Sequence, residues 1–544
     1  MDCALAHARL RVPRARSAHP DCVESARCQP RLPFGAVRRS ARIARWRNDL
    51  DSDSVRRTVA PVTGTAAATA EGTRRYAERA TGAGLPAAAF RPLGRTGLTT
   101  SALGFGTYRV DESTPDHAVA LRRALDAGVN LIDTSTNYTD GSSERTIGSV
   151  LRGRARDEII VVSKVGYVQG QALALSRKRE ADGKPFPDMV KYMDGCWHCI
   201  HPEFLADQLT RSLDRLGVQR IDVYLLHNPE YFFSYAAKRR KDVPIETLRD
   251  EFYERVARAF AHLETEVARG RIGWYGVSSN SFGDGPEDPE ATSVERVLEI
   301  AKQAATPHHF AAVQLPANLY ETGPILTRNN ARETQSAIEF AAANDLAVLV
   351  NRPLNAYRQG RLVRLADAGP VAAPASSIAA QAAAIAKLEA ESPGKRVAWG
   401  KEVVAAARSV TTVADWIRIE GQIRAQIAGR IGEVGGGLSG DAVVGFDQWM
   451  ARYLPALDSF LAAQRAEIGE RGRKATHAAL DPHLPPKWRT ESLSRKAIAV
   501  LVNTPGVACV LNGMRRPAYV DDALGAVRRP AFTAQAGLFR ALAR

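Results

Sequence analysis

Short apolar runs alternate with longer amphipathic segments along most of the chain from about residue 100. The longer segments repeat apolar residues every three or four positions, which is typical of the buried face of a helix. Apolar runs joined by helices are typical of parallel strands that are covered on both faces. The predicted strands are Ser101–Thr107, Val129–Ser135, Glu158–Val165, Ile221–His227, Arg271–Ser279, Phe310–Pro316, Leu346–Leu354 and Gly506–Gly513.

Eight strands that alternate with helices predict an α/β fold, a (β/α)8 TIM barrel. A doubly wound open sheet is the alternative, and it normally opens its first helix with a G-x-G-x-x-G turn. The first turn here, Gly104 to Tyr108, lacks the third glycine, which favours the barrel. The predicted helices are Pro115–Ala127, Glu144–Arg152, His201–Gly217, Glu246–Arg269, Val294–Gln303, Glu333–Ala343, Thr490–Leu501 and Ala518–Val527.

Three further segments exceed a minimal barrel. Two polar inserts, Gly166–Ile200 and Asn228–Pro244, follow the third and fourth strands, at the carboxyl ends where barrel active sites lie. The largest segment, residues 369–486, is alanine-rich with helical spacing, as in Ala379–Ala390. It predicts a helical insertion between the seventh and eighth strands, with a loop at the glycine-rich Gly432–Asp441.

Residues 1–88 are rich in Arg, Ala, Ser and Pro and show no periodicity, so we expect a disordered tail there. Three explanations for this tail stay open: an organellar transit peptide, a start codon assigned too early, or a functional basic arm. We expect the barrel to occupy residues 89–368, with strands one to seven, and residues 487–530, with strand eight and the last helix. A C-terminal tail at residues 531–544 would follow.

The net charge of +15 raises the question of nucleic-acid or membrane binding. The arginines are scattered rather than gathered in a stripe interleaved with aromatic residues, so no nucleic-acid partner is expected. No apolar run reaches the roughly 18 residues that a membrane-spanning helix requires, so no membrane association is expected either.

The six cysteines do not indicate a disulfide framework, since three lie in the tail and no secretory signal is visible. We therefore expect a reducing compartment and a cytoplasmic protein, with organellar import through the tail as the alternative. The segment GCWHCIHP places Cys196, His198, Cys199 and His201 within six residues. That spacing would strain a tetrahedral zinc site, so no metal is expected.

Polar residues stand at the ends of three predicted strands. Asp133, Lys164 and His227 each interrupt or end an apolar run, and Tyr138 lies in the loop after Asp133. The carboxyl ends of parallel barrel strands meet at one mouth, so we expect these side chains to lie together. An ammonium lowers the pKa of a nearby phenol from about 10, an aspartate holds the ammonium, and a histidine orients a substrate oxygen. The set predicts proton transfer, although each residue alone is more often a cap, a solvated charge or a packing residue.

The sequence resembles the aldo-keto reductase family in motifs that are spread over the predicted barrel. The resemblance covers Phe90 to about Ala368 and resumes at about Lys487. Each motif alone is weak evidence for the family, whereas all of them together in this order are specific for it. The matching text is FRPLGRTGL, LGFGTYR, LIDTSTNYTDGSSERTIG, VVSKVG, IDVYLLHNPE, IGWYGVSSNS, VQLPANLYE and TPGVACVLNGMRRPAYVDDAL.

This resemblance implies an oxidoreductase that transfers a hydride between C4 of a nicotinamide and a carbonyl or alcohol carbon. The substrate would be a small-molecule aldehyde, ketone or sugar. The family's catalytic tetrad would be Asp133, Tyr138, Lys164 and His227, with Tyr138 as general acid and base. Tyr108 would be the aromatic residue beside the substrate.

The resemblance also implies NADP(H) as the cofactor. Arginines in the loop for the adenosine 2′-phosphate favour NADP over NAD, since a guanidinium can hold a phosphate with two hydrogen bonds. Two positions depart from the family: Asn351 replaces the ring that stacks on the nicotinamide, for which Tyr357 is the alternative, and Ala523 replaces an asparagine. The implied cofactor-binding residues are Gly106, Thr107, Ser279, Asn280, Gln314, Gly513, Met514, Arg515, Arg516 and Asp522.

Two other functions stay open on the sequence. Some relatives resemble regulatory or scaffold subunits that bind NADP with slow or no turnover, and residues 369–486 would then be the partner surface. A metal-dependent hydrolase on the same barrel would need several His and Asp ligands at strand ends, and only Asp133 and His227 qualify. The oxidoreductase is favoured because all four tetrad positions are filled.

Overall fold

The computed structural model describes residues 67–358, 361–367, 377–392, 400–410 and 412–543. The chain divides into two units, Met1–Gly64 and Thr65–Arg544, and the described residues all belong to the second. Most of the expected disordered tail, residues 1–66, therefore lies outside the described residues.

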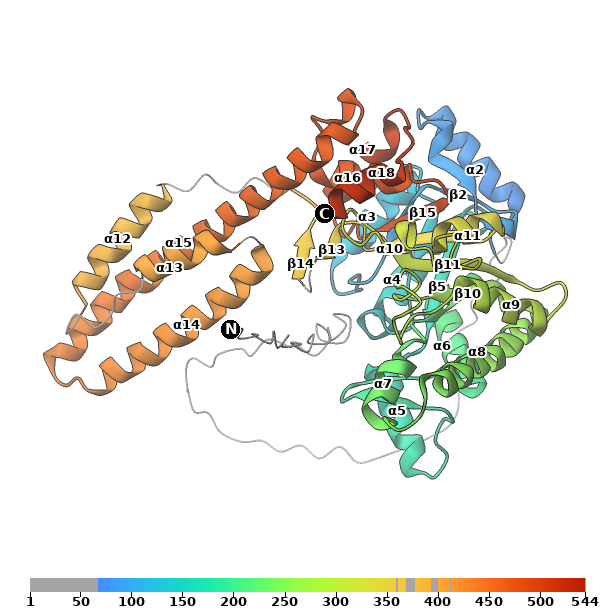
Figure 1. Ribbon diagram of the computed structural model, residues 1–544, viewed down its shortest axis with the longest axis horizontal. Helices are drawn as coiled ribbons and strands as arrows, with labels where there is room; N and C mark the ends of the chain where they lie inside the picture. Colours follow the sequence, from blue (N-terminus) through green and yellow to red (C-terminus); the bar gives the residue numbers. More distant parts are fainter. Residues whose placement is uncertain (1–66, 359–360, 368–376, 393–399, 411, 544) are drawn as a thin grey trace, which may run out of the picture. The chain divides into compact units, whose positions relative to one another are not determined.

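Eight parallel strands close into a barrel in chain order, which confirms the predicted fold class (Figure 1). The last strand returns to pair with the first, with Val510 facing Leu103. The strands are β3 (Leu103–Gly106), β4 (Leu131–Asp133), β5 (Ile160–Val165), β9 (Ile221–His227), β10 (Ile272–Ser278), β11 (Phe310–Pro316), β12 (Ala347–Asn351) and β15 (Val507–Asn512).

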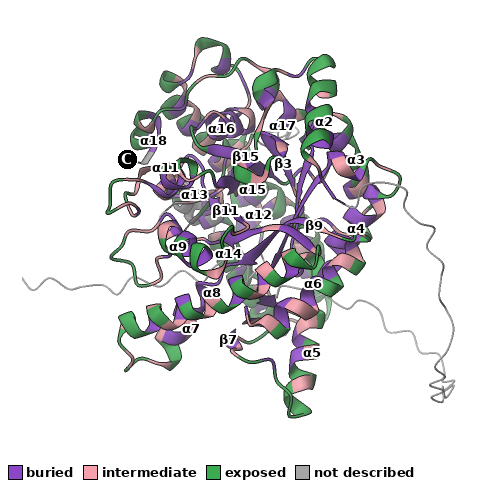
Figure 2. Ribbon diagram, turned by 90° about the vertical axis from the view of Figure 1, so that its right-hand side faces the viewer, coloured by how far each residue is buried: buried purple, intermediate pink, exposed green. Residues whose placement is uncertain are grey.

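The strands are continuous apolar runs because both of their faces are covered. Every residue of β5, β9, β11 and β15 is buried. Side chains such as Leu131, Val162, Leu225 and Leu349 fill the barrel, and helices with exposed outer faces surround it (Figure 2). These helices are α3 (Pro115–Asp126), α4 (Ser142–Leu151), α6 (Pro202–Leu216), α8 (Ile245–Ala268), α9 (Val294–Ala304), α11 (Ala337–Ala343), α16 (Leu493–Val502) and α17 (Pro517–Arg528).

The ends of these helices follow from local chemistry. Proline opens α3, α6 and α17, where its missing N–H needs no partner. Helix α6 ends at Gly217, which takes a left-handed φ of 65°. Helix α11 begins at Ala337, later than predicted, because Ser336 and Glu339 form a capping box and Glu333 has a positive φ.

A short hairpin, β1 (Phe90–Pro92) and β2 (Thr99–Ser101), precedes the first barrel strand. Leu93 and Leu98, between its strands, pack into the core with residues at the amino ends of the barrel strands. Gly94 has a φ of 52°, and a Cβ there would lie 2.5 Å from the amide nitrogen of Ala347. Only glycine fits this contact between the hairpin and the barrel.

An N-terminal helix, α2 (Ala70–Gly82), shows that the expectation of disorder up to residue 88 is wrong for residues 67–88. Gly72 lies so close to the barrel that a Cβ there would be 2.3 Å from the carbonyl oxygen of Asp157. Arg79 forms an ion pair with Glu158 at 2.6 Å. Tyr76 of the same helix is buried, packs edge-on against Phe90 and donates to the carbonyl oxygen of Leu125. These contacts join segments that are distant in the sequence, so apolar periodicity did not predict the helix.

The two polar inserts have secondary structure of their own. The first forms β6 (Tyr167–Val168), α5 (Gly170–Ala181), β7 (Val190–Met193) and β8 (Cys196–His198), whose strands make an antiparallel sheet. The second contains α7 (Tyr231–Arg239). Both inserts leave the carboxyl ends of barrel strands, where they border the barrel mouth.

The insertion between the seventh and eighth strands is helical, as predicted, and has its own apolar core, which includes Trp416, Trp449 and Phe460. The loop expected at Gly432–Asp441 is shorter, because α14 continues to Gly436. Although α15 has 40 residues, none of the helices in the described part is both long and apolar enough to cross a membrane. The helices are α12 (Ile378–Ala390), α13 (Gly400–Ser409), α14 (Val413–Gly436) and α15 (Asp441–Leu480).

The expected C-terminal tail contains a further helix, α18 (Ala536–Ala543). Its Phe539 is fully buried, and Leu538 and Leu542 are nearly so. The apolar residues of this segment therefore belong to the folded unit rather than to a free tail.

We predict that Asp222→Ala destabilises the protein strongly. The Asp222 carboxylate, almost fully buried in β9, accepts hydrogen bonds from Ala68 N, Val161 N and the Arg156 guanidinium at 2.7 to 2.8 Å. Removing it leaves Arg156 buried without its anion, which costs about 3–5 kcal/mol of unfolding free energy in a urea titration.

The matched control is Asp521→Ala, which removes the ion pair with Arg123 at a site where both side chains are about half exposed. This change is expected to cost at most about 1 kcal/mol. Equal losses of unfolding free energy in the two variants would contradict the stabilising role of the buried Asp222 carboxylate.

Candidate active site

The structure brings the four predicted catalytic residues together at the carboxyl end of the barrel. Lys164 Nζ lies 2.7 and 2.8 Å from the two carboxylate oxygens of Asp133 and 2.7 Å from the carbonyl oxygen of Thr134. The same ammonium lies 4.9 Å from the ring centroid of Tyr138. The Tyr138 ring meets the imidazole of His227 edge-on at 5.9 Å.

The ion pair between Lys164 and Asp133 is buried, with side-chain exposures of 0% and 5%. Burial raises the pKa of Asp133, and the hydrogen bonds from Lys164 and Gln314 oppose that rise. A buried pair is stable only where hydrogen bonds satisfy both charges. Asp133 therefore serves to hold the ammonium beside Tyr138 rather than to exchange protons with solvent.

Gln314 completes the shell of Asp133. Its Nε2 donates to Asp133 Oδ2 at 2.7 Å, and its Oε1 accepts from Asn351 Nδ2 at 3.2 Å and from Ser278 Oγ at 3.3 Å. Gln314 is one of the residues expected to bind the cofactor, and in the structure its amide donates to Asp133 of the tetrad. Asn351, which replaces an aromatic residue, orients that amide.

His227 is enclosed by polar and aromatic groups. Burial, followed by the positive charge of Lys164, lowers the pKa of His227 well below its usual value, so the ring is neutral. Ser135 Oγ lies 3.0 Å from His227 Nδ1. His198 Nε2 donates to the carbonyl oxygen of His227 at 2.7 Å, and Tyr167 packs edge-on against the imidazole at 4.7 Å.

His198 gives the segment GCWHCIHP a structural role. Burial lowers the pKa of His198 to about 4, so it is neutral and its N–H fixes the end of β9. A Cβ at Gly166 would lie 2.5 Å from His198 Nε2, so only glycine admits this contact. Cys196 and Cys199 are buried and form no disulfide.

Aromatic side chains border the tetrad. Tyr108, 38% exposed, packs edge-on against Tyr138 at 5.2 Å. On the other side, Tyr231 packs against Tyr167 at 5.4 Å and against Tyr192 at 4.6 Å. The two polar inserts thus supply an aromatic wall next to His227.

The residues expected to hold a nicotinamide lie at the ends of the neighbouring strands. Thr107 Oγ1 donates to the carbonyl oxygen of Asp133, directly after Gly106 at the end of β3. Ser279 Oγ lies 2.9 Å from Thr292 Oγ1, so its hydroxyl is engaged in a hydrogen bond within the protein. Asn280 Nδ2, in contrast, is buried without a hydrogen-bond partner among the described residues. This donor fits the carboxamide oxygen of a nicotinamide.

The loop expected to hold a 2′-phosphate, Gly513–Arg516, leads into the amino end of α17. A helix amino end favours an anion because its N–H groups are unpaired. Partial burial lowers the pKa of Arg364, the neighbouring Tyr519 opposes this shift, and the positive charges of Arg515 and Arg109 lower the pKa further. Arg364 therefore lies within electrostatic range of Arg515 and Arg109.

Two residues of that expected set have structural contacts in the described part of the chain. The Met514 side chain is fully buried and belongs to the core. The Asp522 carboxylate accepts hydrogen bonds from Ser494 Oγ at 2.5 Å, Ser492 Oγ at 3.2 Å and Arg495 Nε at 3.0 Å. Asp522 therefore ties α17 to α16.

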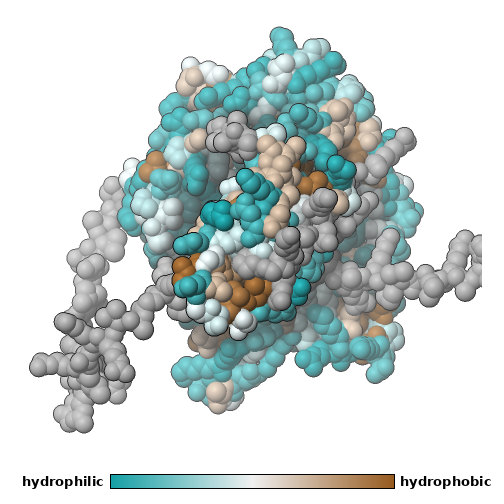
Figure 3. All heavy atoms as spheres, turned by 90° about the vertical axis from the view of Figure 1, so that its left-hand side faces the viewer, coloured by the Kyte–Doolittle hydropathy of each residue, from teal (hydrophilic) through white to brown (hydrophobic). Residues whose placement is uncertain are grey.

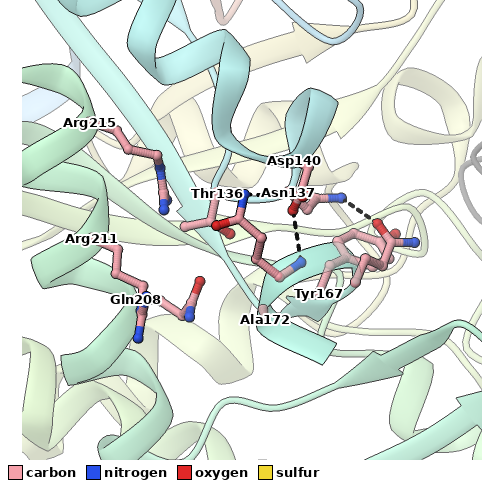
Figure 4. A pocket seen from close by; sticks show the side chains of 10 residues that line it. Thr136, Asn137, Asp140, Tyr167, Ala172, Gln208, Arg211 and Arg215 are labelled. Atoms are coloured by element: carbon pink, nitrogen blue, oxygen red, sulfur yellow. Dashed lines mark hydrogen bonds between the residues drawn. The ribbon is translucent and has the colours of Figure 1, made fainter. Parts of the chain in front are cut away.

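A polar pocket lies between the loop after β4, the first insert and α6 (Figure 4). Arg211 and Arg215 border it from α6, and Asn137 borders it from the loop. Arg211 is paired with Asp207, and Arg215 with Glu144. Because both arginines are already paired, this pocket has no surplus of positive charge for a phosphate.

Three residues of the site do not stand among those predicted from the sequence. Ser135 and Glu230 stand close to the ends of β4 and β9, so the same strand-end argument could have found them. Arg364 lies in a hairpin, β13 (Asn355–Arg358) and β14 (Arg361–Arg364), that no pattern predicted. Its place near Arg515 depends on tertiary contacts alone.

Comparison with known proteins identifies a match between residues 102–395 and the model of the Aldo/keto reductase family. An NADH-specific methylglyoxal reductase of Escherichia coli (strain K12) is 31% identical over 144 residues, which are 25% of this chain and 40% of the relative. A D-threo-aldose 1-dehydrogenase of Pseudomonas sp. is 31% identical over 142 residues, 25% and 42% of the two chains.

A Schizosaccharomyces pombe protein provisionally named as a voltage-gated potassium channel subunit beta is 28% identical over 242 residues, 42% of this chain and 57% of its own length. The chain thus spans about half the length of the curated relatives it matches.

We predict that Glu230→Gln removes a pH-dependent loss of stability. Burial raises the pKa of Glu230 to about 7, whereas an unfolded glutamate titrates near about 4.3. A raised folded pKa means that stability is lost as the pH rises from the unfolded value through the folded value. Relative to wild type, the variant should gain about 2–3 kcal/mol of unfolding free energy between pH 5 and pH 8.

Urea titrations at the two pH values measure this gain. The exposed Glu287→Gln serves as control and should track the wild type. Because Gln keeps an oxygen for the hydrogen bond from Asn280 N, the comparison isolates the charge. A gain that does not change with pH would contradict the burial of an ionisable Glu230.

Proposed function

Since the chain belongs to the aldo/keto reductase family, we propose that it is an NADP(H)-dependent oxidoreductase acting on a carbonyl or alcohol carbon of an aldehyde, ketone or sugar. The observation that carries the proposal is the buried Lys164–Asp133 ion pair beside Tyr138 and His227 at the barrel mouth. A structural barrel would gain little from burying a lysine there, since apolar residues fill such positions at lower cost.

Tyr138 is the proposed proton donor in reduction and the acceptor in oxidation. The nicotinamide, when bound, supplies or takes up the hydride at C4. As the phenol releases its proton to the substrate oxygen, negative charge develops on the phenol oxygen, and the nearby Lys164 ammonium stabilises that charge. Asp133 and Gln314 keep Lys164 in place. Neutral His227 packs edge-on against the Tyr138 ring, with 5.9 Å between the ring centroids.

NADP(H) is favoured over NAD(H) by the cations at the amino end of α17. Arg515 and Arg516 directly precede α17, and no ion pair joins either of them to a carboxylate of the described residues, so their charge is available to a phosphate. The Escherichia coli relative is NADH-specific, so NAD(H) is the alternative that binding measurements must separate.

A regulatory subunit is the second candidate. The insertion has a core of its own and exposes four large apolar side chains, Ile417, Val443, Val444 and Leu454, in its described part. On the face seen in Figure 3, hydrophobic residues form a small patch within a mostly hydrophilic surface. Such a surface fits a protein partner, and the absence of turnover with all substrates would favour this role.

We predict that Tyr138→Phe lowers kcat about 10²–10⁴-fold, because the change removes the phenolic hydroxyl that donates the proton. Cofactor affinity should change little, because the aromatic ring is kept. NADPH oxidation with a panel of small carbonyl compounds measures kcat, and NADPH fluorescence measures the dissociation constant. The control is Tyr235→Phe on α7, which should behave as wild type. Full activity of Tyr138→Phe would exclude its proposed role.

We also predict that the double change Arg515→Ala and Arg516→Ala weakens NADPH binding at least about tenfold and leaves NADH binding nearly unchanged. Each charged hydrogen bond to a phosphate contributes about 1.5–3 kcal/mol. Arg528→Ala, at the far end of α17, is the control for loss of positive charge. An equal loss of affinity for NADPH and NADH would show that these arginines do not recognise the 2′-phosphate.

A further inference from the structure

Glu230 lies in the loop directly after β9, and its side chain is almost fully buried. Its Oε1 accepts a hydrogen bond from the backbone N of Asn280 at 2.8 Å. Its Oε2 is buried as well and has no hydrogen-bond partner among the described residues. A buried carboxyl oxygen without a donor is costly. This atom therefore points to a ligand that brings an N–H or O–H group.

Gln314, which was expected to bind the cofactor, has no acceptor left for such a ligand. Its Oε1 already accepts from Asn351 Nδ2 at 3.2 Å and from Ser278 Oγ at 3.3 Å. An amide oxygen has two lone pairs, and both are used by these donors. Its Nε2 donates to Asp133. Both ends of the Gln314 amide are thus engaged within the protein.

Ser279 is engaged in a similar way. It lies beside the Glu230 carboxyl, but its hydroxyl belongs to a buried cluster, with Thr292 Oγ1 at 2.9 Å and Ser281 Oγ at 3.2 Å. Two groups remain without a partner among the described residues, Asn280 Nδ2 as a donor and Glu230 Oε2 as an acceptor. Because Glu230 bonds the backbone of Asn280, this donor and this acceptor belong to one place in the structure.

A primary amide needs one donor for its oxygen and one acceptor for its N–H. We propose that Glu230 is a cofactor-binding residue whose Oε2 accepts a hydrogen bond from the carboxamide NH2 group of a nicotinamide, while Asn280 Nδ2 donates to the carboxamide oxygen. These two bonds fix the orientation of the carboxamide, since a flipped amide would place its oxygen against the Glu230 carboxyl and its N–H against Asn280 Nδ2. This role rests on the proposed function, which takes a nicotinamide dinucleotide as the cofactor.

Asn351 Oδ1 is a second buried acceptor without a partner among the described residues. Asn351 ends β12, which is separated from β10 by β11, whereas Asn280 follows β10. Glu230, in contrast, bonds Asn280 directly. The direct bond favours Glu230, and the variant Asn351→Ala separates the two acceptors.

The test compares two dinucleotides that differ in one group, NADP⁺ and its 3-acetylpyridine analogue. A methyl group replaces the carboxamide NH2 in the analogue, and the C=O is kept. Calorimetric titration of the full chain without substrate at pH 8 gives both dissociation constants. Burial raises the pKa of Glu230 to about 7, so the carboxyl is ionised at this pH. The wild type should bind the analogue at least about tenfold more weakly than NADP⁺, the effect of one hydrogen bond to a charged group.

Glu230→Gln should weaken NADP⁺ binding at least about tenfold and leave binding of the analogue nearly unchanged. The reason is that Gln has one oxygen, which the backbone N of Asn280 already uses. Asn280→Ala should weaken binding of both dinucleotides, because both carry the C=O. The exposed Glu287→Gln is the control and should bind both as the wild type does. The coupling between the change of residue and the change of ligand separates this bond from any effect on folding.

Equal weakening of both dinucleotides in Glu230→Gln, or no weakening of either, would overturn the role of Glu230. A loss restricted to NADP⁺ in Asn351→Ala and absent in Glu230→Gln would assign the acceptor to Asn351 instead. NAD⁺ and its acetylpyridine analogue are titrated in parallel, so a preference for NAD(H) does not affect the comparison. If the wild type bound none of the four dinucleotides, the proposed function would fail, and the role of Glu230 would fail with it.

Discussion

The buried ion pair between Lys164 and Asp133 is the interaction on which the rest of the site depends. Two charges leave water only if hydrogen bonds replace the lost solvation. The barrel meets this condition with groups from successive strand ends: the carbonyl of Thr134 beside β4, and Gln314 from β11, which is itself held by Asn351 from β12. Closure of the barrel brings these strand ends to one place, so the fold and the ion pair support each other.

The ion pair is surrounded by side chains that connect it to Tyr138 and His227. Lys164 places a positive charge near the Tyr138 ring, and Ser135 joins the loop of Tyr138 to the ring of His227. Arg364, at the end of β14, and Arg515, after β15, lie within electrostatic range of each other. Under the proposed function, these arginines would bind the anionic part of the cofactor, and the tetrad would carry out the proton transfer.

The barrel could be predicted from the sequence because apolar runs and amphipathic helices alternate over long distances, and Asp133, Lys164 and His227 because each departs from such a run. Other features depend on contacts between distant segments. Gln314 was expected to face a cofactor, and only the structure shows its bond to Asp133. Helix α2 packs with Gly72 against Asp157, a contact without an apolar pattern. Arg364 reaches the phosphate region from a hairpin that sequence periodicity does not predict.

Hydride transfer at this site is tested most directly by transfer of deuterium from a cofactor that carries two deuterium atoms at C4, followed by mass spectrometry of the alcohol that a carbonyl substrate yields. Hydride transfer predicts one deuterium on the carbon that carries the new hydroxyl, and none on that carbon when unlabelled cofactor is used in deuterium oxide. Deuterium that enters this carbon from solvent, or no alcohol formed with either NADPH or NADH, would contradict hydride transfer at this site.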